Sequence, residues 1–153
     1  MSLNLPLKCE CGKFRGILEN ASPISGNHIV CMCRDCQTFA HYLKKADVVL
    51  DRSGGTEIYQ VTPSQVKITQ GKQYLRCLNL SPKGANRWFT GCCNTPFANT
   101  GGPKMAFTGV ILRIVDFKQA NVLATEILGP IRFYCFAKYG KEPLPKKASK
   151  GIP

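Results

Sequence analysis

The sequence predicts a mainly β protein organised around clustered cysteines. Short segments rich in β-branched and aromatic residues alternate with turns that contain glycine, proline, asparagine or serine. Nine cysteines are present, and seven of them fall into three tight groups. The 153 residues suffice for one domain with its own hydrophobic core. We expect a single β domain over residues 1–140 and a basic, Pro/Lys-rich C-terminal tail over residues 141–153.

Seven segments have the composition and patterning of strands. In chain order they are residues 13–18, 28–31, 56–61, 66–69, 73–80, 86–89 and 107–115.

Two segments are predicted to be helical. Residues 34–45 contain no glycine or proline and place Phe39, Tyr42 and Leu43 on one face. Residues 117–128 follow Asp116, a competent N-cap, and end before a Gly-Pro pair, which is a common helix stop. We therefore expect one or two short helices beside the sheets.

The cysteine content and the N-terminal residues favour a cytoplasmic location. The first eight residues lack the basic region, apolar run and cleavage site of a signal peptide. In a reducing compartment, clustered cysteines more often bind metal or act in catalysis than form disulfides. The longest apolar stretch, residues 105–115, is interrupted by Arg113 and is shorter than the ~20 residues of a membrane span. We expect no membrane association.

The formal net charge of +12 requires an explanation. Nucleic acid is one candidate partner, because Lys and Arg neutralise phosphates. However, the sequence carries no recognised nucleic-acid-binding motif, and its densest basic run lies between Lys138 and Lys150. A solubilising surface and tail are therefore favoured, while a basic cleft that attracts a small anionic substrate is a third interpretation.

The spacing of the cysteines indicates metal binding. Residues i and i+2 of a strand point to the same side, so a C-x-C motif can present two thiolates to one ion, and a C-x-x-C motif can do so through a tight turn. Zinc is favoured for such sulfur-rich sites, with iron as the alternative. Cys77 and Cys135 lie singly in apolar, strand-like segments and are predicted to be buried core thiols.

Three motifs carry a resemblance to a known family. They read CECG at 9–12, CMCRDCQ at 31–37 and RWFTGCCNTPF at 87–97. Their order resembles that of the glutathione-dependent formaldehyde-activating enzyme family and its centromere-protein-V relatives. The resemblance implies a β-tent zinc fold of twisted antiparallel sheets. It also implies two zinc ions, which we assign to the residues that match the motifs: a structural ion on Cys9, Cys11, Cys92 and Cys93, and a second ion on Cys31, Cys33 and Cys36 with an open position for a thiol.

Two positions depart from the family pattern. The family writes its last motif as F-C-x-x-C-G-S-P, whereas here Thr90 stands at the first cysteine and Cys93 at the second. Either Cys92 or Thr90 therefore completes the structural site. Met32 replaces the histidine that is common inside C-H-C-x-x-C.

Two histidines are candidates for a fourth ligand of the second site. His28 lies three residues before Cys31, an odd separation that turns it to the opposite face of a strand. His41 lies five residues after Cys36, about 140° around a helix. The sequence thus favours an open site with three cysteine ligands over a closed site in which a histidine joins the three cysteines.

An open site with three thiolates suits a thiol substrate better than a water molecule. Its formal charge of about −1 weakens the metal as a Lewis acid. For the resembled family, the reaction is the addition of glutathione to formaldehyde to give S-hydroxymethylglutathione, a carbon-sulfur lyase-type activity. Two alternatives stay open: a non-catalytic structural zinc module that mediates protein interactions, and a nucleic-acid or chromatin binder.

Overall fold

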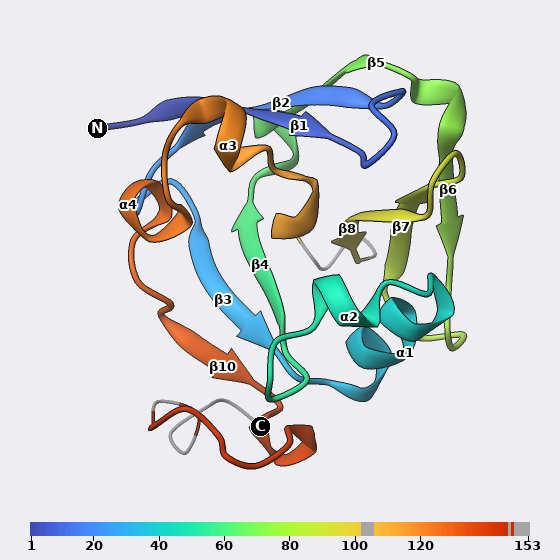
Figure 1. Ribbon diagram of the computed structural model, residues 1–153, viewed down its shortest axis with the longest axis vertical. Coiled ribbons are helices and arrows are strands. Elements are labelled where there is room, and N and C mark those ends of the chain that lie inside the picture. Colours follow the sequence, from blue (N-terminus) through green and yellow to red (C-terminus); the bar gives the residue numbers. More distant parts are fainter. Residues whose placement is uncertain (102–105, 147, 149–153) are drawn as a thin grey trace.

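The computed structural model describes residues 1–101, 106–146 and 148, which form two β-sheets with short helices around them (Figure 1). Ten strands are described, and every neighbouring pair except one is antiparallel. The prediction of a mainly β fold with antiparallel sheets is confirmed.

The smaller sheet has three strands and lies at the top of Figure 1. It consists of β1 (Leu3–Lys8), β2 (Arg15–Ala21) and β5 (Val66–Gln70), in that order. Leu5 and Leu7 alternate with more exposed residues along β1 and are buried, because side chains two apart on a strand share a face.

The larger sheet has seven strands, in the order β10-β3-β4-β9-β8-β7-β6. Their bounds are β3 (Asn27–Cys31), β4 (Thr56–Val61), β6 (Leu75–Leu78), β7 (Asn86–Thr90), β8 (Thr95–Thr100), β9 (Thr108–Ile111) and β10 (Phe133–Cys135). Strand β10 lies parallel to β3 at one edge, and β6 forms the opposite edge.

The two faces of the larger sheet are covered by different elements. On one face, Tyr59 and Val110 pack with the leucines of the smaller sheet in one core cluster. On the other face, Ile58 and Ile111 pack with Phe39 and neighbouring residues of the first helix in a second cluster. This second face also carries Cys31, so the sheet directs the central cysteine motif towards the helix.

The predicted helix over residues 34–45 forms α1 (Arg34–Tyr42), followed after a turn by α2 (Ala46–Val49). Lys44 in this turn has a positive φ of 59°. The single helix predicted over residues 117–128 is wrong. It is divided into α3 (Phe117–Ala120) and α4 (Ala124–Leu128), because Asn121 takes a left-handed conformation with φ of 56°. Asp116 caps α3 as predicted and accepts a hydrogen bond from Gln119 N at 3.0 Å.

Four 3₁₀ turns complete the secondary structure of the described residues: η1 (Pro63–Gln65), η2 (Lys72–Tyr74), η3 (Leu112–Ile114) and η4 (Ala137–Tyr139). Two of them shorten predicted strands, since η2 replaces the start of 73–80 and η3 replaces the end of 107–115. Strands β1, β8 and β10 are absent from the sequence prediction. The first two contain Pro6 and Pro96, which reduce a strand signal, and β10 has only three residues.

The described part of the segment 141–153 packs against the sheet. Lys141 N donates to Ser53 O at 2.8 Å, and Ser53 Oγ donates to Pro143 O at 3.3 Å. Ala148 is buried with Met32 in a third cluster, on the face of β3 opposite to Cys31. Residue 147 and residues 149–153 of the predicted tail, which hold Lys147 and Lys150, lie outside the described residues, and the boundary after residue 140 stays a prediction.

None of the helices in the described part of the chain has the length and apolar character to cross a bilayer.

Tyr59 anchors the turn that leads into β3, and its removal provides a test of the fold. The fully buried hydroxyl donates to Ser22 O at 2.7 Å and accepts from Ser22 N at 3.1 Å. We expect Tyr59→Phe to lower the free energy of unfolding by about 1–3 kcal/mol, because it leaves buried backbone groups unpaired. Urea denaturation measures the change.

Tyr42→Phe is the matched control for this test. Tyr42 is 61% exposed, and its hydroxyl has no hydrogen-bond partner within the described part of the chain. We expect this variant to stay within about 0.5 kcal/mol of the wild type. Equal stabilities of the two variants would contradict the assigned role of Tyr59.

Candidate metal centres

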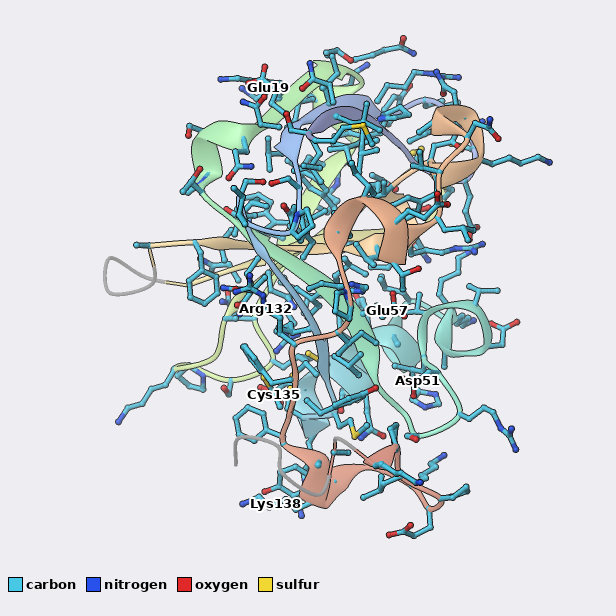
Figure 2. All side chains as sticks on the ribbon, turned by 90° about the vertical axis from the view of Figure 1, so that its left-hand side faces the viewer. Glu19, Asp51, Glu57, Arg132, Cys135 and Lys138 are labelled. Atoms are coloured by element: carbon cyan, nitrogen blue, oxygen red, sulfur yellow. The ribbon has the colours of Figure 1, made fainter. Side chains whose placement is uncertain are left out.

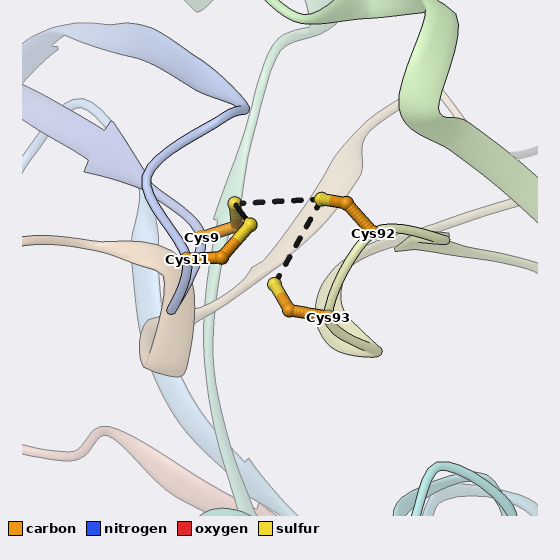
Figure 3. Close-up of side chains that lie close together, drawn as sticks. All are labelled: Cys9, Cys11, Cys92 and Cys93. Atoms are coloured by element: carbon orange, nitrogen blue, oxygen red, sulfur yellow. Dashed lines mark hydrogen bonds between the residues drawn. The ribbon is translucent and has the colours of Figure 1, made fainter.

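Four predicted ligands converge from two turns that are far apart in the sequence. Cys9 and Cys11 lie in the tight turn between β1 and β2, where Gly12 N donates to Cys9 O at 3.0 Å. Cys92 and Cys93 lie in the turn between β7 and β8. Figure 3 shows the four sulfur atoms facing one another across the space between these turns. We call these four cysteines the four-sulfur group.

The separations within the four-sulfur group fit one tetrahedral metal ion. The Sγ atoms are 3.6 Å apart for Cys9 and Cys11, 3.8 Å for Cys9 and Cys92, and 3.9 Å for Cys92 and Cys93. A tetrahedron with metal–sulfur bonds of about 2.3 Å has sulfur–sulfur edges of about 3.8 Å. A disulfide would require about 2.05 Å, and all nine cysteines are free. The group could therefore hold one metal ion.

Cys92, rather than Thr90, is the fourth member of this group. Thr90 is fully buried behind it, with Oγ1 3.5 Å from Cys93 Sγ, and Thr95 Oγ1 is 3.1 Å from the same sulfur. Burial raises the pKa of Cys93, but hydrogen bonds from Thr95 and Thr90 outweigh it and lower this pKa to about 6. The two hydroxyls thus stabilise Cys93 as the thiolate that a metal requires.

The central motif forms a second group, which we call the triad: Cys31, Cys33 and Cys36. Cys31 ends β3, Cys33 is the N-cap of α1, and Cys36 lies in the first turn of that helix. Their sulfur atoms lie within 4.8 Å of one another. Cys33 Sγ accepts a hydrogen bond from Cys36 N at 3.3 Å, as an N-cap side chain does.

The triad concentrates negative charge on one sulfur. Hydrogen bonds from the thiols of Cys31 and Cys36 hold the pKa of Cys33 far below its usual value. The same interactions, together with burial, raise the pKa of Cys31. Ionisation within the triad is therefore most favourable at Cys33. A bound divalent cation would allow all three to ionise, so the triad could hold a second metal ion.

Arg87 is a functional candidate that the sequence analysis missed. It projects from β7, is 5% exposed, and donates from Nη1 to Cys36 Sγ at 3.4 Å. Its guanidinium also lies 5.9 Å from the ring centroid of Phe39. Burial disfavours the charged guanidinium, but its electrostatic interactions with the sulfur atoms of Cys36 and Cys33 outweigh burial and raise the pKa of Arg87. Nothing in the local sequence RWFTGCC reveals a contact across 51 residues.

The triad lines a pocket of about 240 Å³. Arg87, Asn99, Gly109 and Gln60 occupy consecutive register positions on β7, β8, β9 and β4, and all four line the pocket. The remaining lining residues are Ile29, Ile58, Ala85, Phe107, Cys135 and Phe136. Arg87 Nε and Asn99 Oδ1 have no hydrogen-bond partner among the described residues. The pocket therefore combines apolar walls with a row of polar side chains that leads to the triad.

Neither histidine belongs to a metal group in the described part of the chain. His28 is buried on the opposite face, with Nδ1 2.8 Å from Gly129 O and Nε2 3.3 Å from Glu57 Oε2. Burial lowers the pKa of His28, but these hydrogen bonds and the charge of Glu57 raise it above its ordinary value. His41 is exposed on α1.

The two single cysteines occupy opposite edges of the larger sheet. Cys77 lies on β6 and is exposed, so the prediction of a buried core thiol is wrong there. The apolar residues next to Cys77 in the sequence suggest a buried strand, whereas β6 lies at the edge of the sheet. Cys135 on β10 is partly buried and lines the pocket beside the triad. Burial and the negative charge of Cys33 raise the pKa of Cys135.

Exposed cysteines provide a matched test of the four-sulfur group. We expect Cys11→Ser to reduce the metal content by one ion per chain and to lower the unfolding temperature, because it removes one ligand. Cys77→Ser should change neither quantity, although Cys77 is also exposed on the surface. Elemental mass spectrometry and thermal denaturation measure the two effects. Equal metal content in both variants would contradict the assignment.

Arg87→Met tests the electrostatic support of the triad. We expect an affinity for the metal at the triad that is about 10- to 100-fold lower, because the substitution removes the cation beside Cys36. Chelator competition measures this affinity. Arg76→Met is the control, since Arg76 is exposed and donates only to nearby backbone carbonyls. An unchanged affinity in Arg87→Met would contradict this role.

Comparison with known proteins agrees with the architecture. A crystal structure of a Rhodobacter sphaeroides protein aligns with a TM-score of 0.57 and 16% sequence identity, covering 83% of this chain and 97% of that one. At this identity the likeness shows the fold alone. No curated protein matches the sequence. A family model, described as a family of unknown function, matches residues 1–153, and the chain therefore belongs to the DUF6151 family.

Proposed function

We propose that this protein is a cytoplasmic zinc enzyme that forms or breaks an S-hydroxymethyl adduct between a small thiol and a small aldehyde. In this proposal the four-sulfur group holds a structural zinc, and the triad holds the zinc at which the thiol binds. Glutathione is the proposed thiol and formaldehyde the proposed aldehyde, from the resemblance of the three cysteine motifs to the formaldehyde-activating family.

One observation carries the proposal: the triad offers three sulfur atoms and lines a pocket, whereas the other group offers four. Structural zinc sites have four protein ligands, and catalytic sites have three and an open position. Zinc bound by three cysteines would stabilise a further sulfur ligand as a thiolate at neutral pH. The pocket supplies the space from which such a ligand would approach.

The residues of the pocket suit a polar thiol. Arg87 places a positive charge beside Cys36, which offsets part of the negative charge of the thiolates and favours an anionic ligand. Asn99 and Gln60 add amide groups along the same row. Phe107 and Phe136 provide apolar surface that excludes water.

The proposed reaction balances without a redox partner. The thiol sulfur forms a bond to the aldehyde carbon, the carbon–oxygen double bond becomes single, and the proton of the thiol ends on the oxygen. Arg87 is a charged group in the pocket that can donate a hydrogen bond to that oxygen as negative charge develops on it. The reverse reaction returns the proton to the sulfur.

A structural zinc module is the second candidate function. The observation that favours it is the volume of the pocket, about 240 Å³, which lies below the roughly 300–1,000 Å³ of ordinary ligand sites. In that case both metals would only stabilise the sheets, and the surface would bind a protein or nucleic-acid partner.

An NMR assay with isotopically labelled formaldehyde and glutathione separates the two candidates. We expect the zinc-loaded wild type to accelerate interconversion of the free thiol and the adduct, and Cys33→Ser to lose at least about tenfold of that acceleration. Cys77→Ser is the control and should retain it. If a protein with two bound zinc ions leaves the rate at that of the protein-free mixture, the structural module is favoured.

A further inference from the structure

The parallel edge strand places an additional cysteine next to the triad. Strand β10 pairs with β3 so that Phe133, Tyr134 and Cys135 stand opposite Ile29, Val30 and Cys31. Met32 N donates to Cys135 O at 2.9 Å and extends this pairing beyond the strand. Figure 2 shows Cys135 on β10, in the lower half of the molecule. Residues that stand opposite one another in neighbouring strands point to the same face.

Packing confirms that Cys135 and Cys31 share a face. Cys135 packs against the core cluster that contains Cys31 and Cys36. Tyr134, one residue earlier, packs with Val30 and Met32 in the cluster on the opposite face. Cys135 also lines the pocket together with all three triad cysteines. Four cysteines thus border one pocket, three of them in the triad.

Cys135 lies next to the triad without being part of it. Its sulfur is outside the set whose members lie within 4.8 Å of one another. Neighbouring strands are spaced about 4.8 Å apart, so the Cβ atoms of Cys31 and Cys135 lie at a similar separation. A change of the χ1 rotamer of a cysteine moves its sulfur by roughly 3 Å. A side-chain rotation therefore suffices to bring this sulfur towards the triad.

We propose that Cys135 is an exchangeable fourth ligand of the metal held by the triad. It closes the site with a fourth sulfur when no thiol is bound, and it leaves when a substrate thiol enters. The inference rests on the proposed function, because the entering ligand is the substrate thiol. The exchange balances: the entering thiol loses its proton, Cys135 gains one, and the number of sulfur ligands and the charge stay constant.

The position of Cys135 favours exchange over permanent ligation. Cys31 and Cys36 are buried, whereas Cys135 is partly exposed at the end of a three-residue edge strand. The next residue, Phe136, takes a left-handed conformation with φ of 57° and begins the turn η4. An edge strand of this length has one neighbour and few hydrogen bonds to hold it, so local opening costs less there than in the centre of the sheet.

Cadmium NMR of the cadmium-loaded full chain tests the inference, because the resonance of each bound ion shifts downfield with every added thiolate. We expect two resonances in the four-sulfur range for the wild type. In Cys135→Ala one of them should move to the three-sulfur range, while the metal content remains at two ions per chain. Added glutathione should return that resonance to the four-sulfur range.

Glutathione affinity provides the second measurement. If Cys135 occupies the fourth position in about nine molecules of ten, its removal should tighten glutathione binding about tenfold. Cys77→Ala is the matched control, since it removes the single cysteine at the opposite edge of the same sheet. It should leave both resonances and the affinity unchanged.

Two outcomes would overturn the inference, and they differ in what they say about the proposed function. If the wild type and Cys135→Ala give the same two resonances, Cys135 is not a ligand, and glutathione binding to either protein would leave the proposed function intact. If Cys135→Ala keeps only one metal ion and glutathione binds to neither protein, Cys135 is a permanent ligand. The proposed function then fails together with the exchange.

Discussion

Repulsion between closely spaced thiolates is the constraint on which this structure depends. Two thiolates about 4 Å apart repel by about 4 kcal/mol at an effective dielectric constant of about 20. The four-sulfur group holds its neighbouring sulfurs at 3.6 to 3.9 Å, so it needs either shared protons or a cation. Its two halves come from the turn between β1 and β2 and from the turn between β7 and β8, which belong to different sheets. A bound cation would therefore fasten the smaller sheet to the larger one.

The triad meets the same constraint by other means. Its sulfurs come from the end of β3 and the start of α1, so they are local in sequence and do not join distant elements. A divalent cation on three thiolates leaves a formal charge of about −1, and the buried guanidinium of Arg87 offsets one negative charge at the site. The contact between the guanidinium and the sulfur of Cys36 explains how Arg87 tolerates burial without a carboxylate partner among the described residues.

The sequence allowed the local parts of both groups to be predicted, and the long-range parts only through the resemblance. C-x-C and C-x-x-C spacings keep the sulfurs within reach of one another in a strand or a tight turn, so the grouping of Cys9 with Cys11 and that of the triad were predictable from spacing. The contribution of Cys92 to the four-sulfur group depends on the conformation of the turn that follows β7, where Asn94 has a positive φ of 56°.

Arg87 and Cys135 reach the triad through strand pairing, which a single sequence does not reveal. Cys77 was misassigned for the same reason, since burial at an edge depends on sheet order. The apolar pattern over residues 117–128 is continuous, so it does not show that Asn121 takes a left-handed conformation and separates α3 from α4.

The order of the strands also determines what can become the fourth ligand. His28 is three residues from Cys31 along β3, and the alternation of the strand sends it towards Gly129 and Glu57 on the opposite face. Cys135 is more than one hundred residues away in sequence, yet the parallel register sets it directly opposite Cys31. If β10 were antiparallel or shifted along β3, Tyr134 or Phe133 would stand opposite Cys31 instead. A shift by one residue would also turn the side chain of Cys135 to the opposite face of the sheet. The single parallel pairing among the described strands is thus the feature that gives the triad a sulfur neighbour. Because one thiolate ligand would replace another, the proposed exchange changes neither the charge of the site nor the softness of its ligands.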